Sequence, residues 1–561
     1  MTPTATTPAV TKPPTPAPTD ETVVLPADSN QALGLGEFAV RFMSGEIGRP
    51  DDAVLDRTEL FFVDACLCGV SALALRTNAP TVLRAEALDY PALTGGPGAT
   101  VFGSAQPCRA EKAILANCAA VREWDSNGTN FGYEPALGHT AGEFGHNDFY
   151  AVPIAAAQVM GLTGADALRG MILLDEIRGR LASVFSLKTY KIDHVVHGAI
   201  ASAATYGAMT GATPEEIESA IGMVVAHYIP FRAIRAGKQL SDSKGASAAI
   251  STEVAILAVE RAKRGFVGPR DVFRNPEAIF RLFEPTGPID RPAPCPFDLV
   301  LAHSGAGFMV MGMHFKLGLY EHQSAGAIQA VLDLLAANPS LLDDPAGANI
   351  EKIEIVAYQP AFGIIGDPAK KNPTTRQSAD HSMAYIIATL VRKALDKKNA
   401  GGTGVSPVDA GGTGVSPVLD FGEASDSHAA AWKALMLEPA DYSKDAIADP
   451  RTRAIMDKIE FRHGGPEYDR RYPDGIPTSV VITDAAGASH DSGLVMYPAG
   501  HARNTSAPLD DILAHKFRLL GALASDDPDA LISRFSGLRD KTADEIARMN
   551  DFGLTLRDPV D

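Results

Sequence analysis

The sequence predicts a mostly α protein, in which a large all-helical domain precedes a smaller α+β domain and more helix follows. Long apolar stretches with acidic starts and glycine stops run from residue 30 to 265, which is typical of buried helices. Alternation of apolar and polar residues, which indicates strands, appears only between residues 352 and 497. The helical pattern returns in residues 505–561.

Size and charge narrow the class of protein. The chain has 561 residues, 45% of them hydrophobic, which is enough for a large core and for more than one domain. Its formal net charge of −18 would repel nucleic acid and anionic membranes, so we expect neither as a partner. No apolar run reaches the roughly 18 residues that a membrane-spanning helix needs. An anionic substrate would therefore require a pocket with local positive charge.

The cysteines indicate a reducing compartment. They are odd in number and contain no C-x-x-C pair, so we expect free thiols in a cytoplasmic protein and no iron–sulfur cluster. The five are Cys66, Cys68, Cys108, Cys118 and Cys295. No H-E-x-x-H motif is present either, and His139 and His146 are awkwardly spaced for one helical face. We therefore expect no metal and no cofactor.

The first part of the chain divides into a tail and a helical domain. Residues 1–27 are rich in Pro and Thr, lack the apolar core of a signal peptide, and are expected to be disordered. Residues 28–297 are expected to form the N-terminal part of the helical domain, with one helix entered through Asp51 and Asp52. Three later helices are expected to stop at glycines, namely Gly161, Gly211 and Gly265. The phrases GLTGADA and GATPEEIESAIG each predict a turn followed by a capped helix.

The α+β domain is expected to cover residues 298–497. Strands are predicted at 352–358 and 458–463, and a hairpin at 478–497 is expected to turn around Ala485–Ala488.

Two further segments complete the predicted organisation. The phrase GGTGVSPV occurs twice in succession and has no lysine after its glycines, so we interpret residues 399–420 as a flexible insertion, not a phosphate-binding loop. The helical segment 498–561 could pack back on the first domain, which would make the α+β domain an insertion.

The first of four polar clusters is the glycine-rich segment at residues 122–150. It contains Asp125, Thr129, His139 and His146 between two helical stretches. Long loops of this kind more often line a functional site than a core. The alternative is a surface loop in which Asp125 and Thr129 only cap helices.

The second cluster, at residues 231–247, is basic. Arg235 and Lys244 lie in it, and Lys244 stands at the expected start of a helix. A lysine at a helix N-terminus is a suitable site for an anion, because the helix dipole and the ammonium group both attract negative charge. The alternative is a solvated basic turn.

The remaining two clusters are histidine-containing. His322 stands just before an apolar helix, close to His314 and Lys316, and a histidine there is often only a cap or a packed ring. His381 and Tyr385 are four residues apart, which predicts that they share one helical face.

Taken together, these clusters resemble the MmgE/PrpD family, whose name-giving activity is 2-methylcitrate dehydratase. The similarity runs from about residue 35 to 550 and rests on the joint order of WDSNGT, GHNDFYAVPIAAAQ, SDSKGAS, HFKLGLYEHQS, DHSMAYI and YPAGHARN. It implies a helical domain built from both chain ends, an α+β lid between them, a homodimer and no metal.

The resemblance also implies roles for individual residues. The family's acidic loop residue and threonine fall on Asp125 and Thr129, and its loop histidine on His146, with His139 as a rival because this loop is longer than in relatives. Its remaining functional positions fall on Lys244, His322, His381 and Tyr385.

The reaction implied is dehydration of a small tricarboxylate, with 2-methylcitrate giving 2-methyl-cis-aconitate. Such a reaction needs a base, an acid and cations that hold carboxylates. We expect Lys244 and Arg235 to hold the carboxylates, His146 and His322 to transfer protons, and Asp125 to orient an imidazole or to take the proton itself.

Two alternatives remain. One is another lyase or epimerase of the family, such as cis-aconitate decarboxylase. Decarboxylase relatives carry a further histidine shortly after an arginine that matches Arg180, whereas this chain has GRLASVFSLK there, without histidine. The other is a non-catalytic helical binding protein, against which the intact polar clusters argue.

Overall fold

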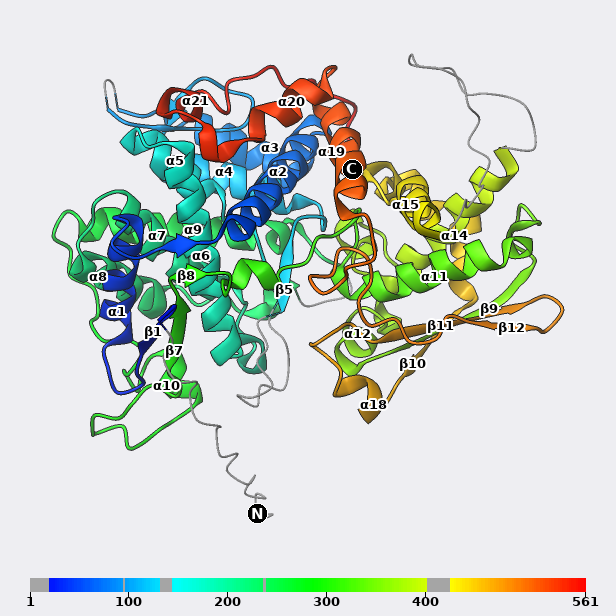
Figure 1. Cartoon of the computed structure of the whole chain (residues 1–561), viewed down its shortest axis with the longest axis horizontal. Coiled ribbons are helices and arrows are strands. Elements are labelled where there is room, and N and C mark those ends of the chain that lie inside the picture. The colour runs from blue at the N-terminus through cyan, green and yellow to red at the C-terminus, as the bar shows by residue number, and fades with distance from the viewer. Residues whose placement is uncertain (1–19, 94–95, 132–143, 236–238, 401–423, 561) are drawn as a thin grey trace.

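The computed structural model describes residues 20–93, 96–131, 144–235, 239–400 and 424–560, which form two lobes (Figure 1). The larger lobe, here called the helical body, contains the helices of roughly the first half of the chain and the last helices. The smaller lobe, here called the α+β lobe, contains a four-stranded sheet and the helices around it. The prediction of a mostly α protein is confirmed.

The helical body begins with a succession of helices joined by short turns. They are α1 (Gln31–Met43), α2 (Asp52–Ala74), α3 (Asn78–Leu88), α4 (Ala110–Glu123), α5 (Ala151–Met160), α6 (Gly164–Val184), α7 (Val195–Met209), α8 (Pro214–His227), α9 (Asp242–Ala262) and α10 (Ile279–Phe283).

Local sequence signals set the ends of these helices as predicted. Thr163 and Thr213 each cap a helix through a capping box, in which the N-cap side chain and the residue three further on bond each other's backbone N–H. The predicted stops at Gly161, Gly211 and Gly265 have φ values of 64°, 80° and 88°. Glycine adopts this left-handed conformation without the steric penalty that a side chain imposes.

Helix α9 lies at the centre of the body. It packs against α4, α7 and α8, and its buried face contains the small residues Ala246, Ser247, Ala248 and Ala249. Small side chains allow the neighbouring helix axes to approach closely, and the closest partner, α4, runs beside α9. This packing brings the first turn of α9 next to the last turn of α4, where the candidate site lies.

Short strand pairs connect segments of the body, and two of these pairs join segments that are far apart in sequence. The pairs are β1 (Thr22–Leu25) with β7 (Leu299–Ala302), β2 (Arg49–Pro50) with β8 (Ser304–Gly305), β3 (Ala99–Thr100) with β4 (Pro107–Cys108), and β5 (Thr129–Phe131) with β6 (Phe144–His146). The expectation of a disordered tail up to residue 27 is wrong for β1, because its β-branched sequence TVVL pairs antiparallel with β7.

The α+β lobe contains the sheet and its covering helices. Its elements are α11 (Ala325–Ala337), β9 (Ile350–Ala357), α12 (Gln359–Ile364), α13 (Arg376–Ala379), α14 (Met383–Ala400), α15 (Ala424–Leu435), α16 (Lys444–Ala448), α17 (Pro450–Asp457), β10 (Ile459–His463), α18 (Pro466–Asp469), β11 (Thr478–Asp484) and β12 (Ser489–Asp491). The strand order is β10-β9-β11-β12, and only the β10–β9 pair is parallel.

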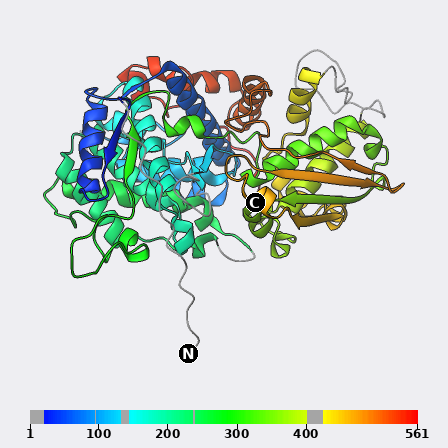
Figure 2. The ribbon, with the colours of Figure 1, turned by 60° about the horizontal axis from the view of Figure 1, so that its bottom comes forward.

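The predicted strands are found in this sheet. The hairpin of β11 and β12 turns between Thr483 and Ser489, as predicted, although β12 ends at Asp491 and does not run to residue 497. Gly493 has a φ of 66°, which departs from extended backbone, and pairing with β11 resumes as a single bridge between Val495 and Thr478. Helix α11 packs on β11 and α14 packs on α11, so the helices cover one face of the sheet (Figure 2). The predicted insertion lies mostly within residues 401–423, outside the described residues.

The end of the chain returns to the helical body. Helix α19 (Leu509–Ala524) packs on α2, and α20 (Pro528–Phe535) and α21 (Ala543–Ala547) follow over α2 and α5. The buried Lys516 of α19 fixes this contact, because its Nζ donates to Asp64 Oδ1 (2.6 Å), to the carbonyl oxygen of Ser126 (2.8 Å) and to that of Lys316 (2.9 Å). The ammonium group of Lys516 thus joins α19, near the end of the chain, to α2, near its start. It also joins both helices to the loops of Ser126 and Lys316, which lead to the candidate site.

Within the described ranges, no single helix is both long and apolar enough to cross a membrane. Helices α2 and α3 would meet the requirement together by length and composition alone, but they are bent by 91° at their junction, and most of α2 is buried within the body.

Candidate active site

A cavity lies where segments of the helical body meet segments of the α+β lobe. The body contributes the end of α4, the 3-10 turns η2 (Leu187–Tyr190) and η3 (Arg232–Arg235), and the start of α9. The lobe contributes η5 (His322–Ser324), η7 (Pro368–Lys370) and the turn before α14. The lining residues are Arg122, Asp125, Lys188, His194, Arg232, Arg235, Leu240, Lys244, Glu321, Gln323, Ile364, Ile365, Lys370 and His381.

The lining of the cavity has an excess of positive charge. Six of its side chains are Lys or Arg, namely Arg122, Lys188, Arg232, Arg235, Lys244 and Lys370, against two carboxyl groups, Asp125 and Glu321. The whole chain has a net charge of −18, so the cavity reverses the sign of the surrounding protein. A site of this kind attracts anionic ligands and repels cationic ones.

Asp125 is the centre of the charged network. It follows α4, where the indole of the neighbouring Trp124 is fixed by a hydrogen bond to Ser71 Oγ (2.9 Å). Its carboxylate forms ion pairs with Lys316 and, at 3.5 Å, with Lys244 Nζ. Burial alone would raise the pKa of Asp125, but the charges of Arg122 and Lys316 hold it well below its usual value. Asp125 is therefore ionised at neutral pH.

Lys244 connects the helical body to the α+β lobe. It stands in the first turn of α9, and its Nζ lies 3.1 Å from Asp380 Oδ1 in the lobe. The side chain is almost completely buried, and this burial lowers the pKa of Lys244 even though Asp380 and Asp125 act against the shift. The ammonium group is thus held by two carboxylates at the wall of the cavity.

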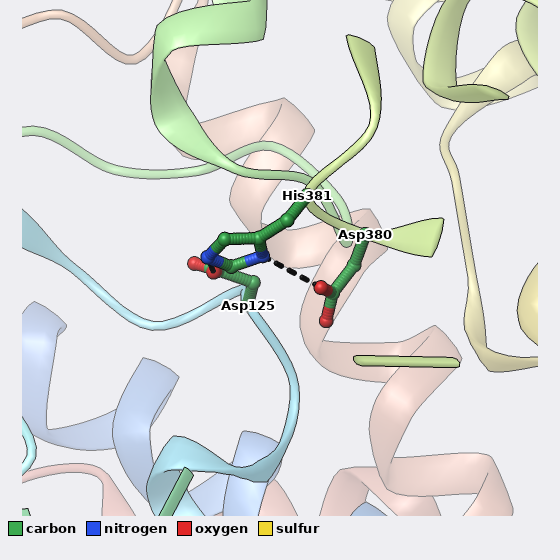
Figure 3. Close-up of side chains that lie close together, drawn as sticks. All are labelled: Asp125, Asp380 and His381. Atoms are coloured by element: carbon green, nitrogen blue, oxygen red, sulfur yellow. Dashed lines mark hydrogen bonds and ion pairs between the residues drawn. The ribbon is translucent and has the colours of Figure 1, made fainter. Parts of the chain in front are cut away.

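His381 lies between the same two carboxylates (Figure 3). Its Nδ1 is 2.7 Å from Asp380 Oδ1, and its Nε2 is 3.2 Å from Asp125 Oδ2. Burial, together with the charge of Lys244, lowers the pKa of His381 to about 4. The imidazole is therefore mostly neutral at neutral pH, with one ring nitrogen beside each of the two carboxylates.

The expectation that His381 and Tyr385 share a helical face is wrong. Helix α14 begins only at Met383, so His381 belongs to the turn that precedes it. The hydroxyl group of the buried Tyr385 donates to the carbonyl oxygen of Asp441 (2.5 Å), and Tyr385 does not line the cavity described here.

The donor set formed by Asp125, Asp380 and His381 resembles a metal site, since the three ligand atoms lie within 4.8 Å of one another. However, Lys244 and Lys316 already neutralise the two carboxylates. A divalent cation placed there would face both ammonium groups at close range, so these residues do not fit a metal ion.

Arg235 is fixed by a buried carboxylate. Its guanidinium group donates to both oxygens of Asp193, at 2.5 and 3.2 Å. Burial raises the pKa of Asp193, but Arg235 and the adjacent His194 lower it below its usual range. This bidentate pairing orients Arg235 at the cavity wall.

His322 is close to the cavity but does not line it. Its neighbours Glu321 and Gln323 do so, whereas its own ring stacks on His314 with 5.1 Å between centroids. His314 in turn lies 4.1 Å from the ring of His501. Burial and the nearby Lys316 lower the pKa of His322 well below its usual value, so this imidazole is neutral.

Two of the remaining predicted residues, Thr129 and His146, lie on the strand pair β5–β6. Thr129 is buried, pairs with His146 across the two strands, and forms a bridge to His314 through backbone bonds of 3.1 and 2.8 Å. Of His146 only the backbone is described, and His139 lies outside the described residues. Thr129 does not line the cavity within the part of the chain that the structure describes.

A buried ion pair joins the lobe to the body beside Asp125. Arg376 of α13 pairs with the carboxylate of Glu123, the last residue of α4, and its guanidinium lies 4.9 Å from the ring centre of Trp124. Both charged side chains are only 2% exposed. The pair fixes the end of α4, from which Asp125 projects.

Sequence reasoning missed several residues of the cavity. These are Arg122, Lys188, His194, Glu321, Gln323 and Lys370. Arg122 and Glu321 each stand close to a predicted site residue, and this proximity in sequence is the signal that could have identified them. Lys188 and Lys370 lie in unremarkable polar turns, where the sequence carries no such signal.

Known proteins resemble this chain along most of its length. Residues 37–291 match the MmgE/PrpD N-terminal domain, and residues 428–532 match the MmgE/PrpD C-terminal domain. A protein named 2-methylcitrate dehydratase from Escherichia coli O157:H7 is 24% identical over 455 residues, which cover 77% of this chain and 82% of the relative. Proteins of the same name from Salmonella typhimurium and Cupriavidus necator are 24% identical over 466 residues and 25% over 456, with the same coverage.

Proposed function

The chain belongs to the MmgE/PrpD family, which includes 2-methylcitrate dehydratases, and on that premise we propose that it is a metal-independent hydro-lyase converting 2-methylcitrate to 2-methyl-cis-aconitate. The observation that carries this proposal is the cavity between the lobes, with six Lys or Arg side chains against two carboxyl groups. Such a lining suits a small acid with three carboxylates. It also surrounds a neutral imidazole that can accept a proton.

In this proposal Lys244 and Arg235 hold substrate carboxylates. Both side chains are fixed by buried acids, Lys244 by Asp380 and Arg235 by Asp193, so little side-chain entropy remains to be lost on binding. Positive charge at these positions also stabilises the enolate-like charge that develops when the proton alpha to a carboxylate leaves.

We propose His381 as the base that removes this proton. Its Nε2 lies 3.2 Å from Asp125 Oδ2 and its Nδ1 lies 2.7 Å from Asp380 Oδ1, so the imidazolium that forms would lie between these two carboxylates. Two flanking acids stabilise that charge without moving. His322 and His146, which the sequence favoured as a proton-transfer pair, remain rival candidates for this step.

The α+β lobe would act as a lid inserted into the helical chain. The cavity takes residues from both lobes, so closure of the lobe on the body would complete the site and exclude water. A homodimer in the cytoplasm is part of the same proposal, and sedimentation of the purified protein would test the dimer.

The function is tested with purified protein after dialysis against a chelator. Incubation with 2-methylcitrate should produce the absorbance of a conjugated alkene, and incubation with cis-aconitate should release no CO₂. Lys244→Met should abolish the alkene signal, whereas Lys433→Met, which removes an exposed lysine paired with Asp511, should leave it unchanged. CO₂ release from cis-aconitate, or no reaction with 2-methylcitrate, would contradict the proposal.

A further inference from the structure

Glu321 is a carboxyl group in the cavity wall that the predicted set of site residues does not include. It caps the turn η5, where one carboxylate oxygen accepts a hydrogen bond from the backbone N–H of Gln323 (2.9 Å). Its own N–H donates to the carbonyl oxygen of Asp380 (2.9 Å), and the preceding Tyr320 N–H donates to that of Asp125 (3.0 Å). The backbone bonds therefore fix Glu321 against the two acids that flank His381.

Titratable side chains from several elements surround Glu321. Asp125 comes from the body, Lys316 from the same segment of the lobe, Lys370 from η7, and the Tyr358 phenol from the end of β9. Burial and the negative charge of Asp125 raise the pKa of Glu321 to about 7, against the opposing influence of Lys316. The cavity thus contains one carboxyl group that is ionised at neutral pH, Asp125, and one that still carries a proton in a large fraction of molecules.

Acid–base chemistry at neutral pH needs one group that is unprotonated and one that is protonated, which here are His381 and Glu321. Dehydration breaks a C–H bond and a C–O bond and leaves a double bond and water. The base takes the proton from carbon, and the leaving hydroxyl group needs a second proton to depart as water. A protonated carboxylic acid supplies it and becomes a carboxylate, which is reprotonated before the next turnover.

Resting on the proposed function, we propose that Glu321 is the general acid that delivers this proton to the departing hydroxyl group. His381 and Glu321 then serve opposite ends of the breaking H–C–C–O unit from neighbouring parts of the cavity wall. The positively charged side chains around them hold the carboxylates of the substrate.

The test compares Glu321→Gln with wild type on two substrates. With 2-methylcitrate, the variant should lose about 10²–10⁴-fold in kcat with little change in KM, which is the contribution of one general acid. With an analogue that carries fluorine in place of the hydroxyl group, the loss should be less than about 10-fold, because fluoride departs with far less help from an acid. A variant that is only misfolded would lose both activities.

The pH profile provides a second measurement. A general acid acts only while protonated, so the wild-type kcat/KM should fall as the pH rises through about 7, and the fall should vanish in Glu321→Gln. Glu321→Asp should keep the fall with a reduced rate. Glu351→Gln, the same change at an exposed position of β9, is the matched control and should behave like wild type.

The outcomes separate the two proposals. No wild-type turnover of 2-methylcitrate would overturn the proposed function and the role of Glu321 with it. Wild-type turnover together with an unimpaired Glu321→Gln, or equal losses on the hydroxy and fluoro substrates, would overturn only the role of Glu321.

Discussion

Replacing Lys516 with methionine tests whether its buried ammonium group stabilises the contact between α19, α2 and the loops that lead to the candidate site. The change keeps the length of the side chain but removes three hydrogen bonds, to Asp64, to the carbonyl group of Ser126 and to that of Lys316. Asp64 is completely buried, so removing its partner leaves a buried charge that costs about 3–5 kcal/mol. Each carbonyl group left without its donor adds about 1 kcal/mol or more.

We therefore expect Lys516→Met to lower the free energy of unfolding by about 5–7 kcal/mol. Urea denaturation followed by tryptophan fluorescence measures this change, because Trp124 reports on the body and Trp432 on the α+β lobe. Adding Asp64→Asn to Lys516→Met removes the unpaired charge and should recover about half of the loss. A loss below about 1 kcal/mol, or no recovery in the double variant, would refute the reasoning.

The pH dependence of the same variant gives an independent check. Burial already raises the pKa of Asp64 in the folded protein, and loss of the ammonium group should raise it further. A carboxyl group with a raised folded-state pKa binds its proton more tightly in the folded than in the unfolded chain, so lower pH favours folding. The destabilisation by Lys516→Met should therefore be larger at about pH 8 than at about pH 5. An equal effect at both values would show that Asp64 is not the group concerned.

Four further predictions concern activity. Lys244→Arg should abolish turnover like Lys244→Met, with unchanged far-UV circular dichroism, because a planar guanidinium does not fit the position of an ammonium between Asp125 and Asp380. His322→Ala tests the rival base: abolished turnover with the circular dichroism intact would assign the proton transfer to His322 in place of His381, and near-wild-type rates would remove His322 from the mechanism. Because a base must be unprotonated, the acid-side decline in kcat/KM should come only as the pH falls toward about 4, the pKa of His381, and an acid-side decline near pH 6.5, the usual value for histidine, would argue for another base. Dialysis against a chelator should leave kcat unchanged, and restoration by added divalent cation would contradict the ion pairing of Asp125 and Asp380.

The elements of the fold were predictable where the signals are local. Thr163 and Asp166 lie three residues apart and cap α6 regardless of what the rest of the chain does. The turn at Asp380–Ser382 was not predictable, because SADHSMAY contains neither glycine nor proline to mark the break between α13 and α14. The spacing of His381 and Tyr385 therefore predicts a shared helical face, although α14 begins only at Met383.

The candidate site was predictable as a set of residue types and not as a set of contacts. Lys244 and Asp380 are 136 residues apart, and Lys316 and Asp125 are 191 apart. Periodicity and composition report nothing about such pairs. The same holds for Glu321, whose chemistry depends on burial next to Asp125, a property that its neighbours in sequence do not reveal.

The ion pair between Glu123 and Arg376 limits how the two lobes can move apart, and the guanidinium of Arg376 also lies on the ring of Trp124. Lifting the lobe away at this point would bring a carboxylate and a guanidinium out of a dry, well-packed environment and separate them. Turning the lobe about the pair disturbs neither group. We expect the lobe to rotate about this ion pair as a hinge. The side of the cavity farthest from α13 would then open, while Asp125, beside the hinge, stays in place.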